Sequence, residues 1–211
     1  TGTIDVIGGK NIVAKAAAAG ATTIEIDEDA DAKTAATIEK ITIDSAGAGA
    51  TIGGKLNGSV DALKELTVKN GAAGQTVAVT TAVETLKVNL DNSAATSVVT
   101  LNDAKLKTLN VDASGKESSV DLNNASAVLE TLNISGNAKL TLEGASTVIT
   151  GSSVKEINVT NTKGVVIADT LGINTKFTGG TGNDSVKIDA TTKAIAMGAG
   201  DDTVELTATK T

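Results

Sequence analysis

Near its C-terminal end the chain reads Gly179-Gly180-Thr181-Gly182-Asn183-Asp184-Ser185-Val186-Lys187. This segment fits the nonapeptide pattern Gly-Gly-x-Gly-x-Asp-x-apolar-x at every fixed position. A second copy departs from the pattern only at its first glycine and reads Met197-Gly198-Ala199-Gly200-Asp201-Asp202-Thr203-Val204-Glu205. It begins 18 residues after the first copy, which is the length of two nonapeptides.

This offset is typical of a parallel β-roll, in which each turn of the coil holds two nonapeptides and equivalent loops stack. Calcium takes about six to eight oxygen ligands, many of them backbone carbonyls, and glycine lets the backbone aim those carbonyls. We therefore expect a calcium ion between the stacked loops, held by the carboxylates of Asp184 and Asp202 and by backbone oxygens. The glycines expected in this site are Gly180, Gly182, Gly198 and Gly200.

The alternative interpretation is a pair of ordinary glycine-rich hairpin turns, with aspartates bonded to the local backbone. It explains the glycines but not the offset. Asn183 and Asp201 stand at the variable position of the pattern, so we expect them in solvent. The segment 188–196 lacks the glycines but keeps Ile195 in register with the apolar position of both copies. One calcium site, or at most two, is therefore expected here.

A weaker repeat, apolar-x-x-apolar-x-apolar, fills the middle of the chain. Its six copies start 20 to 25 residues apart and occupy residues 38–43, 63–68, 83–88, 106–111, 129–134 and 154–159. Shorter alternating segments lie between them at 76–79, 99–101, 120–122, 140–142 and 165–167. Such a period indicates stacked units, and the alternation indicates strands, with Leu109 and Val111 facing inward and Asn110 facing water. The sequence predicts an all-β protein, a parallel β-solenoid with two short strands in each rung of about 20–25 residues.

A leucine-rich-repeat horseshoe is the competing fold. The segment from Leu129 to Asn137 matches the strand pattern of that family, including its asparagine. The other copies place different residues at the asparagine position, namely Gly71, Asp91, Ser114 and Thr162. Because a second strand stands where a helix would follow, we favour the solenoid.

The first 37 residues lack the repeat and are expected to form an irregular cap. Within them, the alanine-rich stretch from Asn11 to Gly20 predicts a short helix that Asn11 caps and Gly20 ends. We expect one elongated solenoid over 1–211, with the cap at 1–37, degenerate repeats at 38–176 and a calcium-binding, roll-like end at 177–211.

A second acidic segment follows the alanine-rich stretch. Asp27, Asp29 and Asp31 are spaced like the first three ligands of an EF-hand loop. Ala32 stands where that loop needs glycine, and Ile38 stands where it needs glutamate, so this is not an EF-hand. A simpler calcium loop and a solvated acidic turn both remain open, and the turn is favoured.

The composition narrows the range of functions. There is no cysteine, histidine, arginine, tryptophan or tyrosine, and the net charge is −7. Disulfide and thiol chemistry are therefore excluded, and an acidic chain without arginine or aromatic platforms argues against nucleic acid. No 18-residue apolar run predicts a membrane span. Sugar-cleaving enzymes on β-helices need a lysine, arginine or histidine base and aromatic platforms for sugar rings. Histidine, arginine, tryptophan and tyrosine are absent and no carboxylate pair stands out, so we expect no enzyme and no catalytic residues.

The chain resembles surface-layer proteins of Gram-negative bacteria, of the Campylobacter and Caulobacter type. The resemblance lies in the bias toward threonine, alanine, glycine and valine, the lack of cysteine, the degenerate repeats and the calcium nonapeptides. Motif by motif, the resemblance covers only about residues 177–206. It implies export through a one-step (type I) secretion channel, folding in extracellular calcium and self-assembly on the cell surface. The implied partner is the chain itself, with a cell-surface polysaccharide bound through other parts of the parent protein.

Related calcium repeats occur in secreted toxins and adhesins, so the alternative is a ligand-binding module of such a protein. The chain starts at Thr1 without a methionine or a leader, and it stops at Thr211 soon after the second turn. We therefore expect it to be a piece of a longer protein.

Overall fold

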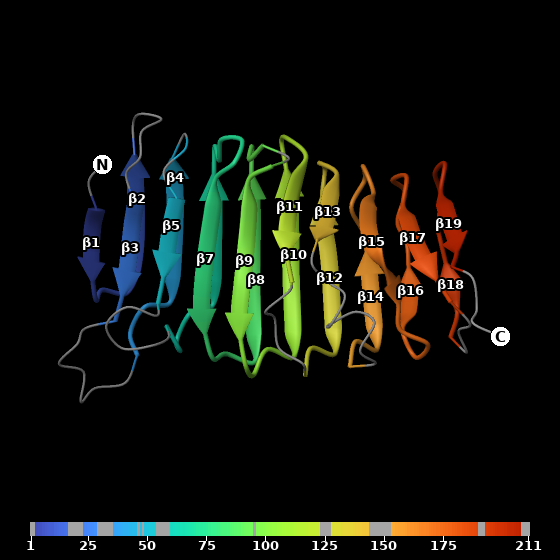
Figure 1. Ribbon diagram of the computed structural model, residues 1–211, viewed down its shortest axis with the longest axis horizontal. Helices are drawn as coiled ribbons and strands as arrows, with labels where there is room; N and C mark the ends of the chain where they lie inside the picture. Colours follow the sequence, from blue (N-terminus) through green and yellow to red (C-terminus); the bar gives the residue numbers. More distant parts are fainter. Residues whose placement is uncertain are drawn as a thin grey trace.

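The computed structural model describes residues 3–16, 23–28, 36–45, 47, 49–53, 60–94, 96–122, 128–143, 153–189 and 193–207. These residues form strands and turns and contain no helix, so none of them forms a helix that could span a bilayer. The strands run parallel in two sheets and build a β-solenoid, whose rungs follow one another from the N-terminal to the C-terminal end of the long axis (Figure 1). The predicted fold is confirmed.

Odd-numbered strands form one sheet, sheet A, and even-numbered strands form the other, sheet B. Sheet A contains β1 (Thr3–Ile7), β3 (Thr23–Asp27), β5 (Gly49–Ile52), β7 (Thr76–Thr81), β9 (Val98–Asp103), β11 (Ser118–Asp121), β13 (Leu140–Glu143), β15 (Val165–Leu171), β17 (Ser185–Ile188) and β19 (Thr203–Leu206). Sheet B contains β2 (Asn11–Ala16), β4 (Lys40–Ser45), β6 (Glu65–Lys69), β8 (Thr85–Asp91), β10 (Thr108–Ser114), β12 (Thr131–Gly136), β14 (Glu156–Val159), β16 (Lys176–Thr178) and β18 (Ile195–Ala196). Each rung therefore carries one strand in each sheet, as the two interleaved repeats predict.

The core is a column of small branched side chains between the two sheets. In β10, Leu109 and Val111 are buried while Asn110 between them is half-buried on the outer face, which confirms the predicted alternation. Phe177, the only aromatic residue, is fully buried in β16. Each fully buried Leu, Ile or Val contributes about 1.5–3 kcal/mol, so the column supplies the main driving force for folding.

The N-terminal helix prediction is wrong. Residues 11–16 form strand β2, which pairs in parallel with β4 from Asn11↔Lys40 to Ala16↔Ser45. Ile12 is buried, and Ala14 and Ala16 pack against the same core, so every second side chain faces inward. This burial and pairing outweigh the helix propensity of alanine. Residues 17–20 of the predicted helix lie outside the described residues.

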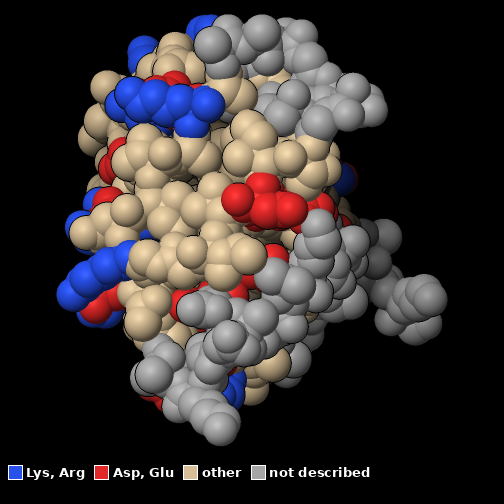
Figure 2. Space-filling model, turned by 90° about the vertical axis from the view of Figure 1, so that its left-hand side faces the viewer, with Lys and Arg blue, Asp and Glu red and all other residues tan. Residues whose placement is uncertain are grey.

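Strands also occupy other parts of the region predicted to be an irregular cap. β1 pairs with β3, and β3 pairs with β5, so both sheets extend into the first 37 residues. The described residues leave the core uncovered at both ends of the stack, where Ile4 is 46% exposed and Leu206 is 69% exposed. Figure 2 shows the N-terminal end, where uncharged residues fill much of the centre and lysines lie at the rim.

Ion pairs link successive rungs across the outer face of sheet B. The second residue of the repeat alternates in sign from copy to copy: Glu39, Lys64, Glu84, Lys107, Glu130 and Lys155. Parallel pairing joins these residues two by two, and the Nζ–Oε distances are 3.2 Å for Lys64–Glu39, 2.8 Å for Lys107–Glu84 and 2.7 Å for Lys155–Glu130. The alternation therefore avoids like charges on neighbouring strands. We call this row of residues the charge ladder.

Candidate metal centre

The two glycine-aspartate turns lie on one edge of the solenoid and belong to successive rungs. Turn 179–184 joins β16 to β17, and turn 197–202 joins β18 to β19. Backbone hydrogen bonds stack the turns: Gly179 N donates to Ala196 O at 2.7 Å, and Ala199 N donates to Gly180 O at 2.8 Å. The offset of 18 residues thus corresponds to one full turn of the coil, as β17 and β19 pair Val186 with Val204.

Glycine is required in these turns for two physical reasons. Gly198 and Gly200 have φ of 86° and 133°, where a side chain would strain the backbone. Gly182 has an ordinary φ, but a Cβ there would collide with the backbone nitrogen of Gly164 in the preceding rung. The glycines therefore bring the backbones of neighbouring turns into close contact.

Asp184 lies buried at the end of the first turn, with 1% of its surface exposed. Its Oδ1 accepts a hydrogen bond from Val165 N of the preceding rung at 2.8 Å. Its backbone N donates to Oδ1 of Asp202 in the following rung at 2.9 Å. The second carboxylate oxygen, Oδ2, is buried and accepts no hydrogen bond from the described residues. Asp184 therefore carries one buried oxygen that needs a partner.

Burial raises the pKa of Asp184 above the usual aspartate value, although the Val165 N–H opposes this effect. The negative charge of Asp202 raises this pKa further, and the nearby Gly180 N–H lowers it. An ionised carboxylate with an unsatisfied oxygen in this place is costly, because burial penalises charge without a partner. A cation bound at Oδ2 would remove this cost.

The available donors fit a calcium ion. Oδ2 of Asp184, the carboxylate of Asp202 and the carbonyls of the two turns are all hard oxygen ligands of the kind calcium prefers. Within the described ranges no group of three or more His, Cys, Asp or Glu side chains could hold a metal. A cation here would therefore need backbone carbonyls of the turns, including those of Gly180, Gly182, Gly198 and Gly200.

The residues at the variable position lie outside this centre. Asp201 is exposed, and its backbone N donates to Oδ1 of Asn183 at 3.0 Å. This hydrogen bond between Asp201 and Asn183 links the two turns at the surface, where the sequence pattern predicted solvated side chains. Asp201 is therefore a suitable control position beside the candidate centre.

The acidic segment near the N-terminus is a separate feature. Asp27 is buried at the end of β3 rather than solvated, and Asp29 and Asp31 lie outside the described residues. The next residue, Glu28, is also buried, and its Oε1 accepts hydrogen bonds from the backbone N of Thr37 and Ile38 at 3.0 and 2.9 Å. Glu28 therefore fixes the chain just before β4, a structural role that the sequence analysis missed.

The sequence analysis also missed a series of buried polar side chains in the turns that lead from sheet B to sheet A and at the start of β11. Its members are Gln75, Ser93, Ser97, Ser118, Ser119 and Asn161, and Asp184 continues it. Asn161 shows what these side chains do: its Nδ2 donates to the carbonyls of Ser135 and Ala138 at 3.2 and 2.6 Å. Its Oδ1 accepts from the backbone N of Lys163 and Gly164 at 2.7 and 3.0 Å. Here an amide satisfies the backbone groups of two successive turns.

An Asn two residues before the Lys163-Gly164 pair is a recognisable turn signal, but the sequence does not show that this asparagine is buried. In the middle rungs, the buried polar side chains along this edge of the solenoid are thus hydroxyl and amide groups. At the C-terminal rungs it presents a carboxylate with a free oxygen.

Comparison with known proteins does not assign this chain to a family, because no protein-family model and no curated protein sequence matches it.

Proposed function

We propose that this chain is a structural module of a secreted bacterial surface-layer protein, stabilised by calcium at its C-terminal turns. The observation that carries the proposal is the buried Oδ2 of Asp184, which has no hydrogen-bond partner among the described residues. Asp184 ends the first of two stacked turns whose sequence follows the calcium nonapeptide. Asp184 and Asp202 supply the carboxylates, and the turn carbonyls supply the remaining oxygens.

Calcium would couple folding to location. Without the ion, folding has to bury the carboxylate of Asp184 close to that of Asp202. With the ion, the binding free energy adds to the free energy of folding, because the unfolded chain holds no such site. Extracellular modules bind calcium with dissociation constants of about 10⁻⁴ to 10⁻³ M. A site of that strength fills outside the cell and stays empty in the cytoplasm.

The rest of the architecture suits a stiff building block. Two continuous sheets and one core column connect each rung to the next, and the ion pairs of the charge ladder add links between pairs of rungs. The sequence singles out no catalytic residue, and the surface-layer resemblance implies contacts between copies of the chain. The alternative is a ligand-binding module of a calcium-dependent adhesin or toxin, which would share the calcium turns without forming a lattice.

The first test is thermal unfolding in excess chelator and then in millimolar calcium, with Asp184→Asn and the control Asp201→Asn. At a calcium concentration about 30 times the dissociation constant, the ion adds about 2 kcal/mol. The melting temperature should therefore rise by about 4–8 °C in the parent chain and in Asp201→Asn. It should not rise in Asp184→Asn. An equal calcium response in all three proteins would contradict the site.

The second test separates the lattice from the alternative. Light scattering of the parent chain in calcium should show growth beyond the monomer, and Asp184→Asn should stay monomeric. A chain that gains calcium stability but remains monomeric at high concentration would argue against the surface-layer role and for the adhesin role. Magnesium at the same concentration controls for simple charge screening.

A further inference from the structure

The pair Asn70-Gly71 directly follows β6 and is one of two Asn-Gly pairs in the chain. Such a pair is chemically reactive, because glycine has no Cβ to shield its backbone nitrogen from the side-chain amide before it. The nitrogen of Gly71 can attack Cγ of Asn70 and lose its proton, and the Cγ–Nδ2 bond then breaks and releases ammonia. Water opens the resulting five-membered succinimide at either carbonyl, which leaves aspartate or isoaspartate at position 70.

In the folded chain the side-chain amide of Asn70 is held from two sides. Its Nδ2 donates to Oδ1 of Asp44 in the preceding rung at 2.8 Å. Its Oδ1 accepts from Nδ2 of Asn92 in the following rung, also at 2.8 Å. Attack at Cγ converts the planar amide into a tetrahedral centre, so it distorts or breaks both hydrogen bonds. The row Asp44–Asn70–Asn92 therefore opposes the reaction.

The backbone on both sides of the reacting peptide bond is also held. Asn70 has a φ of 55°, a left-handed conformation that asparagine adopts more readily than most residues. Its N donates to Asp91 O at 2.9 Å, and the carbonyl of Gly71 accepts from Ala94 N at 2.8 Å. The nitrogen of Gly71 therefore approaches Cγ only if the chain detaches from the next rung.

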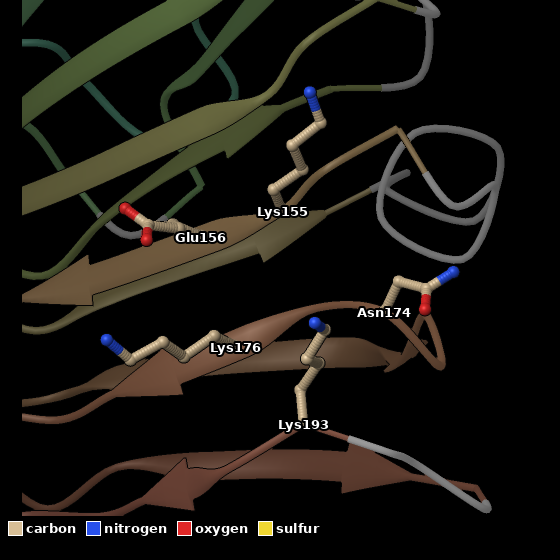
Figure 3. A pocket seen from close by; sticks show the side chains of 5 residues that line it. All are labelled: Lys155, Glu156, Asn174, Lys176 and Lys193. Atoms are coloured by element: carbon tan, nitrogen blue, oxygen red, sulfur yellow. The ribbon is translucent and has the colours of Figure 1, made fainter.

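Another turn asparagine shows that this combination is specific to Asn70. Asn174 is exposed in the turn between β15 and β16. It lines an open hollow of about 410 Å³ together with Lys155, Glu156, Lys176 and Lys193 (Figure 3). The residue after it is Thr175, whose branched side chain shields the backbone nitrogen that would attack. Asn174 thus has an open amide without a reactive neighbour, whereas Asn70 has a reactive neighbour and a held amide.

Neither product of the reaction fits the folded chain. An aspartate at position 70 would lose the hydrogen bond to Asp44 and place a second carboxylate beside it. An isoaspartate would also lengthen the main chain by one atom next to Gly71. There is no room for this, because even a Cβ on the buried Gly71 would collide with the side-chain oxygens of Ser97 and Gln75.

We propose that Asn70 is a deamidation site that the unfolded chain exposes to reaction and the folded chain protects. The reaction needs no reagent except water. A chain that stays unfolded therefore gradually loses the ability to form this corner of the solenoid, and the deamidated product marks chains that folded late. No residue of the candidate calcium centre takes part, so the proposal is independent of the proposed function.

The first test follows Asn70 by peptide mass spectrometry while the full chain is incubated at mildly alkaline pH, in native buffer and in concentrated urea, with the same calcium concentration. In urea, Asn70 and Asn57 of the other Asn-Gly pair should react at similar rates. In native buffer Asn70 should react at least about tenfold more slowly than in urea, since an opening free energy of about 1.4 kcal/mol already lowers the reactive fraction tenfold. Equal rates of Asn70 in buffer and in urea would overturn the proposal.

A pair of variants tests the side-chain row. Asp44→Ala removes the acceptor of the Asn70 amide and should raise the rate in native buffer about threefold without changing it in urea. Asn137→Ala removes an exposed asparagine two rungs further on and should leave both rates unchanged. The melting temperatures of the two variants should be similar, which separates a local effect from general unfolding. An unchanged rate in Asp44→Ala would show that the row does not protect Asn70.

A second pair of variants tests the cost of the product. Asn70→Asp reproduces the aspartate product and should lower the melting temperature by about 2–4 °C. Asn137→Asp adds the same charge, but Oδ1 of residue 137 only accepts a hydrogen bond from Gly115 N, a role that aspartate keeps. This control should melt within about 1 °C of the parent chain. Equal melting temperatures of Asn70→Asp and the parent chain would show that the corner accommodates the product, against the proposal.

Discussion

At the scale of single residues, the turns on one edge are joined by side chains that reach back to the rung before them. Asn161 does so with an amide that bonds two carbonyls, and Asp184 does so with a carboxylate oxygen that accepts from Val165 N. Both polar atoms of the Asn161 amide form hydrogen bonds, whereas Oδ2 of Asp184 has no hydrogen-bond partner among the described residues. This difference explains why we expect a cation at Asp184 and none at Asn161.

We predict that Asn161→Ala lowers the free energy of unfolding by about 2–4 kcal/mol, because it leaves buried backbone groups of two turns without partners. Asn137→Ala is the control, since Asn137 is exposed and accepts one hydrogen bond of 3.2 Å from Gly115 N. That change should cost less than about 1 kcal/mol. Urea unfolding of both variants checks this prediction, and equal losses would show that Asn161 holds no special position.

Sequence reasoning found the candidate site only in part at this scale. The spacing of the glycines and aspartates placed Asp184 and Asp202 in successive rungs, which pairing of β17 with β19 confirms. It did not find Asn161 or Glu28, because their roles depend on burial. A lone Asn or Glu in a polar segment has the same sequence signature whether it faces the core edge or the solvent.

At the scale of strands, parallel pairing places equivalent residues of successive rungs side by side, so the sign of each charge has to suit its neighbour. Glu65 of β6 illustrates this. Its hydrogen bond with Lys40 lowers its pKa most, and Asn89 and Lys87 lower it further, while burial opposes the effect. The ionised form of Glu65 therefore favours the folded state.

We predict a pH-dependent stability difference between the parent chain and Glu65→Gln. Because the pKa of Glu65 in the folded state lies below the ordinary 4.5, its contribution is complete above about pH 4.5 and is lost as the pH falls through the folded-state pKa. For a partly exposed pair the difference at neutral pH should be below about 1 kcal/mol. Denaturant unfolding from pH 7 to pH 3 measures it. A salt concentration of about 1 M should shrink the difference at neutral pH, and a difference that grows on acidification would contradict the assignment.

The strands themselves were predictable where Leu, Ile and Val alternate with polar residues, as in β10 and β12. Strand β2 was not predictable, because its alanines suit a helix as well as a strand with small inward side chains. Only the pairing with β4 decides between the two. One register was also unexpected: the repeat aligns Leu66 with Leu86, whereas the strands pair Leu66 with Val88. A shift of two residues keeps the same side chains inward, so the hydrophobic pattern alone does not detect it.

At the scale of the whole molecule, each rung is paired only with the rungs before and after it. Stability in such a stack is close to a sum of rung and neighbour contributions, and the end rungs have one neighbour instead of two. The described residues leave Ile4 and Leu206 exposed at the two ends. The ends should therefore open more readily than the middle.

We predict a gradient of amide hydrogen exchange along the solenoid. Amides of β8, β10 and β12 should exchange slowest, and those of β1 and β19 should exchange fastest, because local opening is easiest where neighbours are missing. Calcium should slow exchange in residues 177–206 and leave residues 3–27 unchanged. Hydrogen–deuterium exchange with mass spectrometry, in chelator and in calcium, provides the measurement. Uniform protection along the chain would indicate a single cooperative unit instead.

The alternating signs of the charge ladder also restrict how such a chain can lengthen by duplication of its coding sequence. Copying one coil beside itself would place glutamate against glutamate, or lysine against lysine, at a separation of about 4.8 Å. Copying two coils together would preserve every attraction. Descendants of this chain that differ in length should therefore differ by even numbers of coils along the segment from Glu84 to Lys155, where the pairs Glu84–Lys107 and Glu130–Lys155 follow one another.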